Sequence, residues 1–427
     1  MKILNINSKN FDKNLDILLS NRKNKVKSNS VSVFKIIKDV KKNGDKAVLK
    51  YEKRFNNNKV ITPTSKQISK LIKSLDQNVK KAIDLAYKRI YKFHSLQKFK
   101  NISYTDKLNN KLEYKYLPID SVAIYVPGSS ASYPSSVLMN AIPALVAGVR
   151  RIVMLNPSDK GKQSPAVLYA ARKCKIKEIY SIGGPSAIAA AAFGTNKIKK
   201  VNKIVGPGNA YVAAAKKEVF GEVGIEGMTA GPSEITIVSD KFSNPEWVAS
   251  DLIGQAEHDA QAQCILISKD KRLIEKVKIE IVNQLKEIPR MSIARESLKQ
   301  NGILMYINSN KKIVDVVNKI APEHLELNIK NYKSLVTKIK NSGSICLGKY
   351  AVMAMTDYNA GSNHILPTNA SAKYSSGISV NEFYKRISYI NLSKKGIESL
   401  GPSVITLANY EGLAGHAQSV KKRIRRK

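Results

Sequence analysis

The sequence of 427 residues has few cysteines and no long apolar run. Its three cysteines, Cys174, Cys264 and Cys346, are odd in number and far apart, which excludes a disulfide scaffold. Such a chain is typical of the reducing cytoplasm, where we expect this protein to reside. No stretch approaches the roughly 18 apolar residues of a spanning helix, and the first residues lack the apolar segment of an export signal. We therefore expect no contact with a membrane.

Acidic residues are also scarce, with 33 Asp and Glu against 72 Lys and Arg, a formal net charge of +39. This excess makes nucleic acid the first partner to consider. The lysines, however, are scattered along the chain, and the few aromatic residues do not alternate with them. Only the final KKRIRRK (421–427) is a basic block. We therefore expect a basic solvated surface that attracts anionic ligands, and no specific nucleic-acid partner.

The 43% share of hydrophobic residues excludes a disordered chain. Short β-branched segments alternate with helical patterns, which predicts βαβ units and parallel sheets. Strands are expected at 121–126, 151–155, 178–182, 203–205, 235–239, 264–268 and 303–307. Helices are expected at 78–99, 135–148, 164–174, 186–193, 209–219, 245–258, 271–287 and 311–320. These two series predict an α/β fold with two Rossmann-like parallel-sheet domains, a small N-terminal arm and a helical C-terminal domain.

Glycine-rich turns follow several of the expected strands, as in PGSS, GGPS and GPGN. Ligands of open parallel sheets bind at the carboxyl ends of strands, and glycine allows a close approach of the backbone. None of these turns is a full G-x-G-x-x-G pattern, so a plain tight turn is an equally good interpretation.

Four of the five histidines lie beside acids or amides, whereas His94 lies on a long expected helix and is interpreted as structural. Gln255 and His258 are three residues apart at the end of a predicted helix, on one face, where both could bind one metal ion. Asp357, in an expected loop, and His416 offer further donors that zinc accepts. Taken singly, each of these histidines is more often a structural or surface residue, and only their shared setting makes one common site an equally good interpretation.

Glu323 and His324 form an adjacent acid and imidazole after a proline. Both could reach a ligand at a helix start, and His324 could act as a base near neutral pH. The alternative is an ordinary first turn of a helix, in which proline and glutamate are favoured.

Eight segments together resemble the histidinol dehydrogenase family, in that family's order, over about residues 25–420. They are YVPGSSASYPSSVLMNAIPALVAGV, KIVGPGNAYVAAAKKEVFG, TAGPSEITIV, GQAEHDAQAQCIL, APEHLEL, TDYNAGSNHILPT, SSGISV and EGLAGHAQSV. The resemblance implies the oxidation of L-histidinol to L-histidine, through a bound aldehyde and with reduction of two NAD, as the last step of histidine biosynthesis.

The resemblance also implies a role for particular residues. One zinc ion per subunit would be bound by Gln255, His258, Asp357 and His416. Glu323 and His324 would be the catalytic pair. The substrate would contact Ser233, His324, His364 and Glu411 as well as the zinc ligands. NAD would contact Tyr125, Ser186 and Asn209.

The family further implies an intertwined homodimer, in which Glu411 and His416 reach the active site from the neighbouring subunit. The expected division of the chain is an arm at 1–24, a metal and substrate domain at 25–124 and 234–378, an NAD domain at 125–233, and a helical dimerisation domain at 379–427.

Three positions depart from the family pattern: Ser186 replaces a glutamine, Ser129 a glycine and Met353 a glutamate. They bear on cofactor affinity and substrate choice, so a related zinc- and NAD-dependent dehydrogenase of another small alcohol, such as a sulfonated diol, is the alternative. Glu411, SSGISV and the Lys385-Arg386 pair favour the histidinol branch. The cysteines lie outside the residues given these roles, so no thiol catalysis is expected. A nucleic-acid-binding role is a more remote alternative, which steep salt dependence would reveal.

Overall fold

The computed structural model describes residues 1–427 except 7–9, 25–29, 129–131, 159, 227–230 and 425–427. The chain forms two compact units. The first unit comprises Met1–Gln97 and Asp120–Glu382, and the second comprises Lys98–Ile119 and Phe383–Lys427. Two parallel sheets with helices on their faces confirm the predicted α/β class. No helix within the described ranges has both the length and the apolarity to cross a bilayer.

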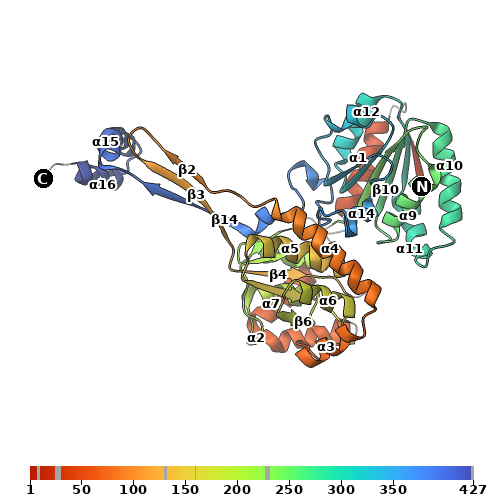
Figure 1. Cartoon of the computed structure of the whole chain (residues 1–427), viewed down its shortest axis with the longest axis horizontal. Helices are drawn as coiled ribbons and strands as arrows, with labels where there is room; N and C mark the ends of the chain where they lie inside the picture. The colour runs from red at the N-terminus through yellow and green to blue at the C-terminus, as the bar shows by residue number, and fades with distance from the viewer. Residues whose placement is uncertain (7–9, 25–29, 129–131, 159, 227–230, 425–427) are drawn as a thin grey trace. The chain divides into compact units, whose positions relative to one another are not determined.

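A six-stranded parallel sheet in the first unit, whose strand β10 is labelled in Figure 1, has the order β1-β11-β10-β9-β12-β13. Its strands are β1 (Lys2–Asn5), β9 (Glu234–Ser239), β10 (Gln263–Ser268), β11 (Ile303–Tyr306), β12 (His324–Asn328) and β13 (Ser344–Leu347). Its helices are α1 (Phe11–Asn24), α9 (Pro245–Ala256), α10 (Lys271–Gln284), α11 (Met291–Asn301), α12 (Asn310–Ile320), α13 (Lys333–Val336) and α14 (Met353–Tyr358). Alternate strand residues face different cores, with α1 and α12 on one face and α9, α10 and α11 on the other.

A second, five-stranded parallel sheet of the first unit has the order β6-β5-β4-β7-β8. Its strands are β4 (Ser121–Tyr125), β5 (Arg151–Leu155), β6 (Glu178–Tyr180), β7 (Lys203–Val205) and β8 (Gly224–Ile225). Its helices are α2 (Ser30–Asn56), α3 (Ser65–Lys73), α4 (Gln77–Ser95), α5 (Pro134–Ala147), α6 (Pro165–Lys173), α7 (Gly184–Phe193) and α8 (Ala210–Glu218). The apolar sides of α2, α7 and α8 share one core with this sheet.

The N-terminal segments pack differently from the prediction. Residues 1–24 are not a separate arm, because β1 pairs in parallel with β11 and Leu15 of α1 is fully buried in the core of the six-stranded sheet. Helix α2 was expected with the metal side but packs on the five-stranded sheet. Local periodicity shows that a helix has an apolar face, but it does not show which sheet that face covers.

The second unit contains a three-stranded antiparallel sheet in the order β14-β3-β2 and two helices. The strands are β2 (Ile102–Thr105), β3 (Lys111–Pro118) and β14 (Tyr384–Asn391), and the helices are α15 (Lys394–Tyr410) and α16 (Ala414–Ile424). The helical C-terminal domain predicted at 379–427 therefore contains its two helices, but the prediction missed strand β14. Strand β14 has no buried residue and pairs with β3, far away in sequence, so its pattern carries little strand signal.

Candidate active site

The predicted catalytic pair lies at the amino-terminal edge of the six-stranded sheet. His324 is the first residue of β12 and is in register with Ile235 of β9, so Glu323 and Ser233 lie at the same edge. The expected helix start at this position is wrong, because Leu325 and its successors are buried between two neighbouring strands. The backbone requires sheet partners there, which the local sequence does not reveal.

Glu323 and His324 are both buried and close together. His324 Nε2 lies 3.9 Å from Glu323 Oε1, and His324 Nδ1 lies 3.2 Å from the Ser344 hydroxyl oxygen. The other carboxylate oxygen of Glu323 accepts the backbone N–H of Glu234 at 2.9 Å. These contacts tie Glu323 to strand β9 and His324 to strand β13, the two neighbours of β12.

Burial decides the protonation of this pair. It lowers the pKa of His324 to about 3, with further contributions from His364 and His258, so the imidazole is neutral at pH 7. Burial also raises the pKa of Glu323 well above its usual range, and the nearby charge of Asp357 raises it further. The hydrogen bond from the Glu234 N–H acts in the opposite direction but is the smaller effect. A neutral imidazole that faces buried groups can accept a proton.

The predicted metal ligands of the first unit flank this pair. Gln255 is in the last turn of α9, and His258 lies just beyond that helix, where its N–H donates to the Gln255 carbonyl at 3.3 Å. Asp357 is in α14 rather than in a loop, and burial raises its pKa to about 7. His364 Nδ1 lies 2.9 Å from the Asp357 carbonyl oxygen and 4.0 Å from its carboxylate. Burial lowers the pKa of His258 and, to about 4, that of His364.

The donor set is suited to a metal but is incomplete within the first unit. No group of three or more His, Cys, Asp and Glu side chains placed to hold an ion occurs among the described residues. Gln255 adds an amide oxygen that is buried and has no hydrogen-bond partner in the described part of the chain. A buried acceptor without a donor is costly, and a cation would satisfy it. One nitrogen and two oxygens of these types fit zinc, with at least one further donor required.

The remaining predicted metal ligand, His416, and the predicted substrate contact Glu411 belong to the second unit. Glu411 caps the end of α15, and His416 is in α16. Both are exposed in the single chain, and the buried cluster is formed by residues of the first unit alone.

The predicted NAD residues lie at the carboxyl ends of strands in the five-stranded sheet. Tyr125 ends β4, and its hydroxyl accepts the N–H of Gly184, the first residue of α7, at 3.1 Å. Burial raises the pKa of Tyr125 to about 12, so it stays a neutral phenol. The hydroxyl of Ser186 donates to the Gly183 carbonyl at 3.0 Å, and Asn209 is exposed and caps α8.

Two of the three family departures are visible in the structure. Ser186 is buried with its hydroxyl already bonded to the turn. The N–H of Met353 donates to the Glu326 carboxylate at 2.7 Å, so an acid lies beside this position although its own side chain is not one. Ser129 lies outside the described residues. Sequence reasoning missed Glu326, whose only signal was a carboxylate inside the apolar stretch HLELN.

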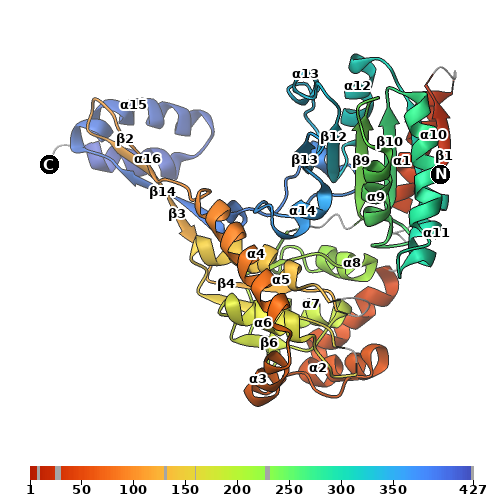
Figure 2. The ribbon, with the colours of Figure 1, turned by 45° about the vertical axis from the view of Figure 1, so that its right-hand side comes forward.

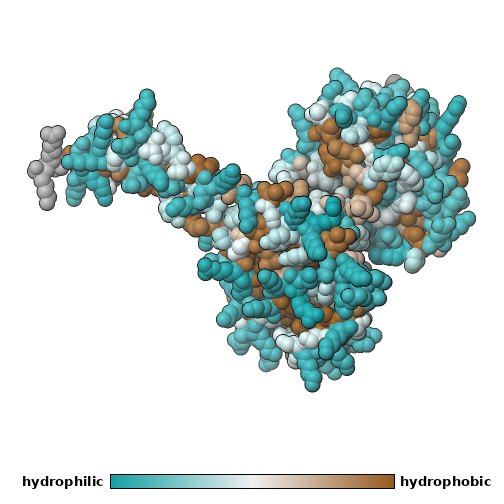
Figure 3. Space-filling model, in the orientation of Figure 1, coloured by the Kyte–Doolittle hydropathy of each residue, from teal (hydrophilic) through white to brown (hydrophobic). Residues whose placement is uncertain are grey.

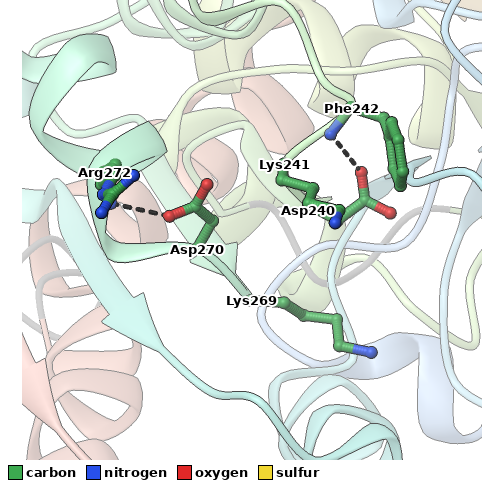
Figure 4. A pocket seen from close by; sticks show the side chains of 6 residues that line it. All are labelled: Asp240, Lys241, Phe242, Lys269, Asp270 and Arg272. Carbon is green, nitrogen blue, oxygen red and sulfur yellow. Dashed lines mark hydrogen bonds between the residues drawn. The ribbon is translucent and has the colours of Figure 1, made fainter.

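None of the predicted site residues lines the cavity shown in Figure 4. This cavity of about 460 Å³ lies beyond the carboxyl ends of β9 and β10 and is lined by Asp240, Lys241, Phe242, Lys269, Asp270 and Arg272. Its two carboxylates accept backbone N–H groups of Phe242 and Arg272 in local turns. The imidazoles and carboxyl groups of the candidate site lie at the amino-terminal edge of the same sheet.

Parallel α/β sheets with a buried imidazole and carboxyl cluster define an α/β protein with an acid–base site. The pattern of the histidinol dehydrogenase family matches residues 19–424. The chain therefore belongs to the histidinol dehydrogenase family, a family of NAD-dependent oxidoreductases.

Similar proteins cover the whole chain. The histidinol dehydrogenase of Pelagibacter ubique is 80% identical over 100% of both chains, and histidinol dehydrogenase 1 of a Nostoc species is 44% identical over 99% of both. The crystal structure of histidinol dehydrogenase from Elizabethkingia anophelis covers 99% of this chain and 98% of its own, with a TM-score of 0.93 and 36% identity. The resemblance seen in the sequence motifs is thereby confirmed.

Proposed function

We propose that the chain oxidises L-histidinol to L-histidine through a bound aldehyde, with reduction of two NAD, as the last step of histidine biosynthesis. Membership of the family supports the substrate. The observation that carries the chemistry is the neutral, buried imidazole of His324 beside Glu323, with His258, His364 and Asp357 around them.

Gln255, His258, Asp357 and His416 of the partner subunit would hold the zinc ion. Bound zinc would supply a Lewis acid that orients the substrate and polarises it. The unpartnered amide oxygen of Gln255 supports this assignment. Ser233, His364 and the partner subunit's Glu411 would contact the substrate, and Tyr125, Ser186 and Asn209 would contact NAD.

His324 acts as the base in both oxidations. In the first, it accepts the hydroxyl proton while the carbon-bound hydrogen leaves with its electron pair to NAD, which yields the aldehyde and NADH. Glu323 then accepts a proton from water as the water oxygen bonds to the aldehyde carbon, and protonated His324 gives its proton to the former carbonyl oxygen, so that the hydrate forms. In the second oxidation, His324 takes a hydroxyl proton of the hydrate, and a second hydride reduces the second NAD. His324 must release its proton between the two steps.

The surface of the second unit supports a homodimer with shared sites. The helices and strands of this unit expose large apolar side chains, and in its C-terminal segment up to residue 424 the buried hydrophobic residues are only Phe383, Ala408 and Ala417. The exposed ones include Ile390, Leu407 and Tyr410, and brown apolar patches interrupt its hydrophilic surface in Figure 3. Apolar surface of this kind is typical of a face that binds another chain, and a second copy would bring Glu411 and His416 to the cluster.

The deciding experiment follows NADH and product on purified, zinc-loaded protein supplied with L-histidinol and NAD. Two NADH per histidinol, L-histidine identified by mass, and loss of turnover on chelation are the expected results. Folded, zinc-binding protein that fails to oxidise histidinol but oxidises a sulfonated diol would contradict the proposed substrate and support the related dehydrogenase.

A further inference from the structure

Two acidic side chains that have no role in the proposed reaction meet behind the candidate site. Asp251 of α9 and Glu326 of β12 bring their carboxyl groups within hydrogen-bonding reach. Glu326 is buried, and one carboxyl oxygen of Asp251 is buried without another hydrogen-bond partner in the described part of the chain. Two carboxylates this close, one buried and the other half-buried, repel each other when both are charged, which favours a proton shared by the pair. In agreement, burial raises the pKa of Asp251 to about 6 and that of Glu326 well above its usual range.

Asp251 and Glu326 each lie on the same face of their helix or strand as a residue of the candidate site. Asp251 precedes Gln255 by one turn of α9, so both side chains lie on the same side of that helix. Glu326 follows His324 by two residues of β12, so both point to the same face of the sheet.

The same pair also reaches the element that carries Asp357. Glu326 Oε1 accepts the N–H of Met353 at 2.7 Å, and Met353 is the first residue of α14. Figure 2 shows helix α14 near strands β12 and β13. Val352, at the N-cap position, makes no side-chain capping bond, so Glu326 supplies the acceptor that this short helix otherwise lacks. Asp357 lies one turn further along α14.

We propose that Asp251 and Glu326 form a positioning pair, which joins α9, β12 and α14 and so fixes Gln255, His324 and Asp357 relative to one another. The roles of those three residues rest on the proposed function. One carboxyl group donates its proton to the other, and the remaining Glu326 oxygen holds the start of α14. The pair contacts neither substrate nor cofactor in this proposal and acts through the residues it orients.

Glu326→Leu and Glu326→Gln separate this role from simple space filling. Leucine removes both the acceptor for Met353 and the partner of Asp251. Glutamine keeps them, because its amide oxygen can accept the Met353 N–H while its NH₂ donates to an ionised Asp251. We expect Glu326→Leu to lower zinc affinity and kcat by about 10- to 100-fold, the usual effect of losing a group that orients a metal ligand. Glu326→Gln should remain within a few-fold of the unchanged protein.

The readouts are zinc affinity by competition with a coloured chelator, the visible spectrum of the cobalt-substituted protein, and kcat and KM for histidinol. Glu52→Leu is the matched control for metal affinity, since Glu52 is also buried and accepts a backbone N–H, that of Gly183, but belongs to the core side of the five-stranded sheet. It should lose stability and keep its zinc affinity and cobalt spectrum.

Three outcomes would overturn the proposal. The first is a folded Glu326→Leu protein with unchanged zinc affinity and cobalt spectrum, and the second is a glutamine variant as damaged as the leucine variant. If Glu326→Leu does not fold, Asp251→Ala decides, because it keeps the bond to Met353 and removes only the link to α9. A folded Asp251→Ala protein with unchanged zinc affinity and spectrum would be the third. If the unchanged protein did not oxidise histidinol, that result would instead contradict the proposed function, and the zinc measurements would still test the positioning pair.

Discussion

His324 is the residue on which the proposed chemistry depends most directly. It is buried and uncharged, so it can accept a proton without first losing one. We expect His324→Asn to lower the rates of both oxidations by about 10²- to 10⁴-fold, the usual contribution of a general base to a rate. Glu323→Gln should slow oxidation of the aldehyde more than that of the alcohol, because only the aldehyde needs a water to be activated. NADH formation from histidinol and from separately supplied aldehyde measures the two steps, and equal losses in both would contradict this division.

The neutral state of His94 predicts a dependence of stability on pH. His94 Nδ1 lies 2.8 Å from the Ile90 carbonyl, so Nδ1 carries the proton and Nε2 faces the Asn363 NH₂ group at 3.4 Å. A second ring proton would point at that donor, and burial lowers the pKa of His94. Unfolded chains therefore bind more protons below the ordinary histidine pKa of about 6.5, and stability falls as pH drops through that value.

In His94→Gln this component should disappear. Urea unfolding of chelator-treated protein, between about pH 5 and pH 7.5, should show a smaller loss of stability at low pH than in the unchanged protein. The difference is at most about 1.4 kcal/mol per pH unit for one proton. Identical pH slopes for the two proteins would mean that His94 does not titrate with unfolding.

At the residue scale, the sequence identified donors and bases but not their support. The motifs around His258, His324 and Asp357 were recognisable, and the structure brings these residues together. Glu326 was missed because its acidity has meaning only beside Asp251 and the start of α14, which are distant in sequence. Whether the assigned residues act as proposed stays a prediction.

At the element scale, Asn209 links the stability of α8 to the proposed NAD contact. Its side chain accepts the N–H groups of Tyr211 and Val212, both at 3.1 Å. Asn209→Ala should lower the free energy of unfolding by about 1 kcal/mol and raise the KM for NAD. Asn209→Asp keeps the cap but places a negative charge where the phosphates of NAD would lie, so only the KM should rise.

Urea unfolding and NAD titration distinguish these effects. Ser309→Ala is the control, because Ser309 caps α12 through the Lys312 N–H and has no proposed cofactor contact. It should lower stability without changing the KM for NAD. An unchanged KM in both Asn209 variants would remove this residue from the cofactor site.

The elements that followed from the sequence are those with a local signal. The strands of the two series from β4 to β11, and the helices between them, were predicted to within a few residues because each carries its own periodicity, except that the short strand β8 and helix α11 were not predicted. Strand β12 was taken for a helix start because Pro-Glu-His has the composition of a first turn, while its real partners are β9 and β13. The antiparallel sheet was missed because β14 and β3 are far apart in the chain.

At the scale of the whole molecule, the sharing of sites between two subunits can be tested by complementation. Inactive His324→Asn and His416→Asn chains are mixed and allowed to exchange subunits. A mixed dimer with shared sites contains one site with both histidines, so activity should return to about a quarter of the original with random pairing. If His324 and His416 of the same chain formed each site, no intact site would arise and the mixture would stay inactive.

All three cysteines of the chain are buried and unpaired in the structure. Burial raises the pKa of each thiol, to about 12 for Cys264 and Cys346, so practically none is ionised at neutral pH. Oxidants such as peroxide attack the thiolate rather than the thiol. The folded protein should thus tolerate peroxide and alkylating reagents at concentrations that inactivate thiol-dependent dehydrogenases, and its turnover would not follow the redox state of the surrounding thiol pool.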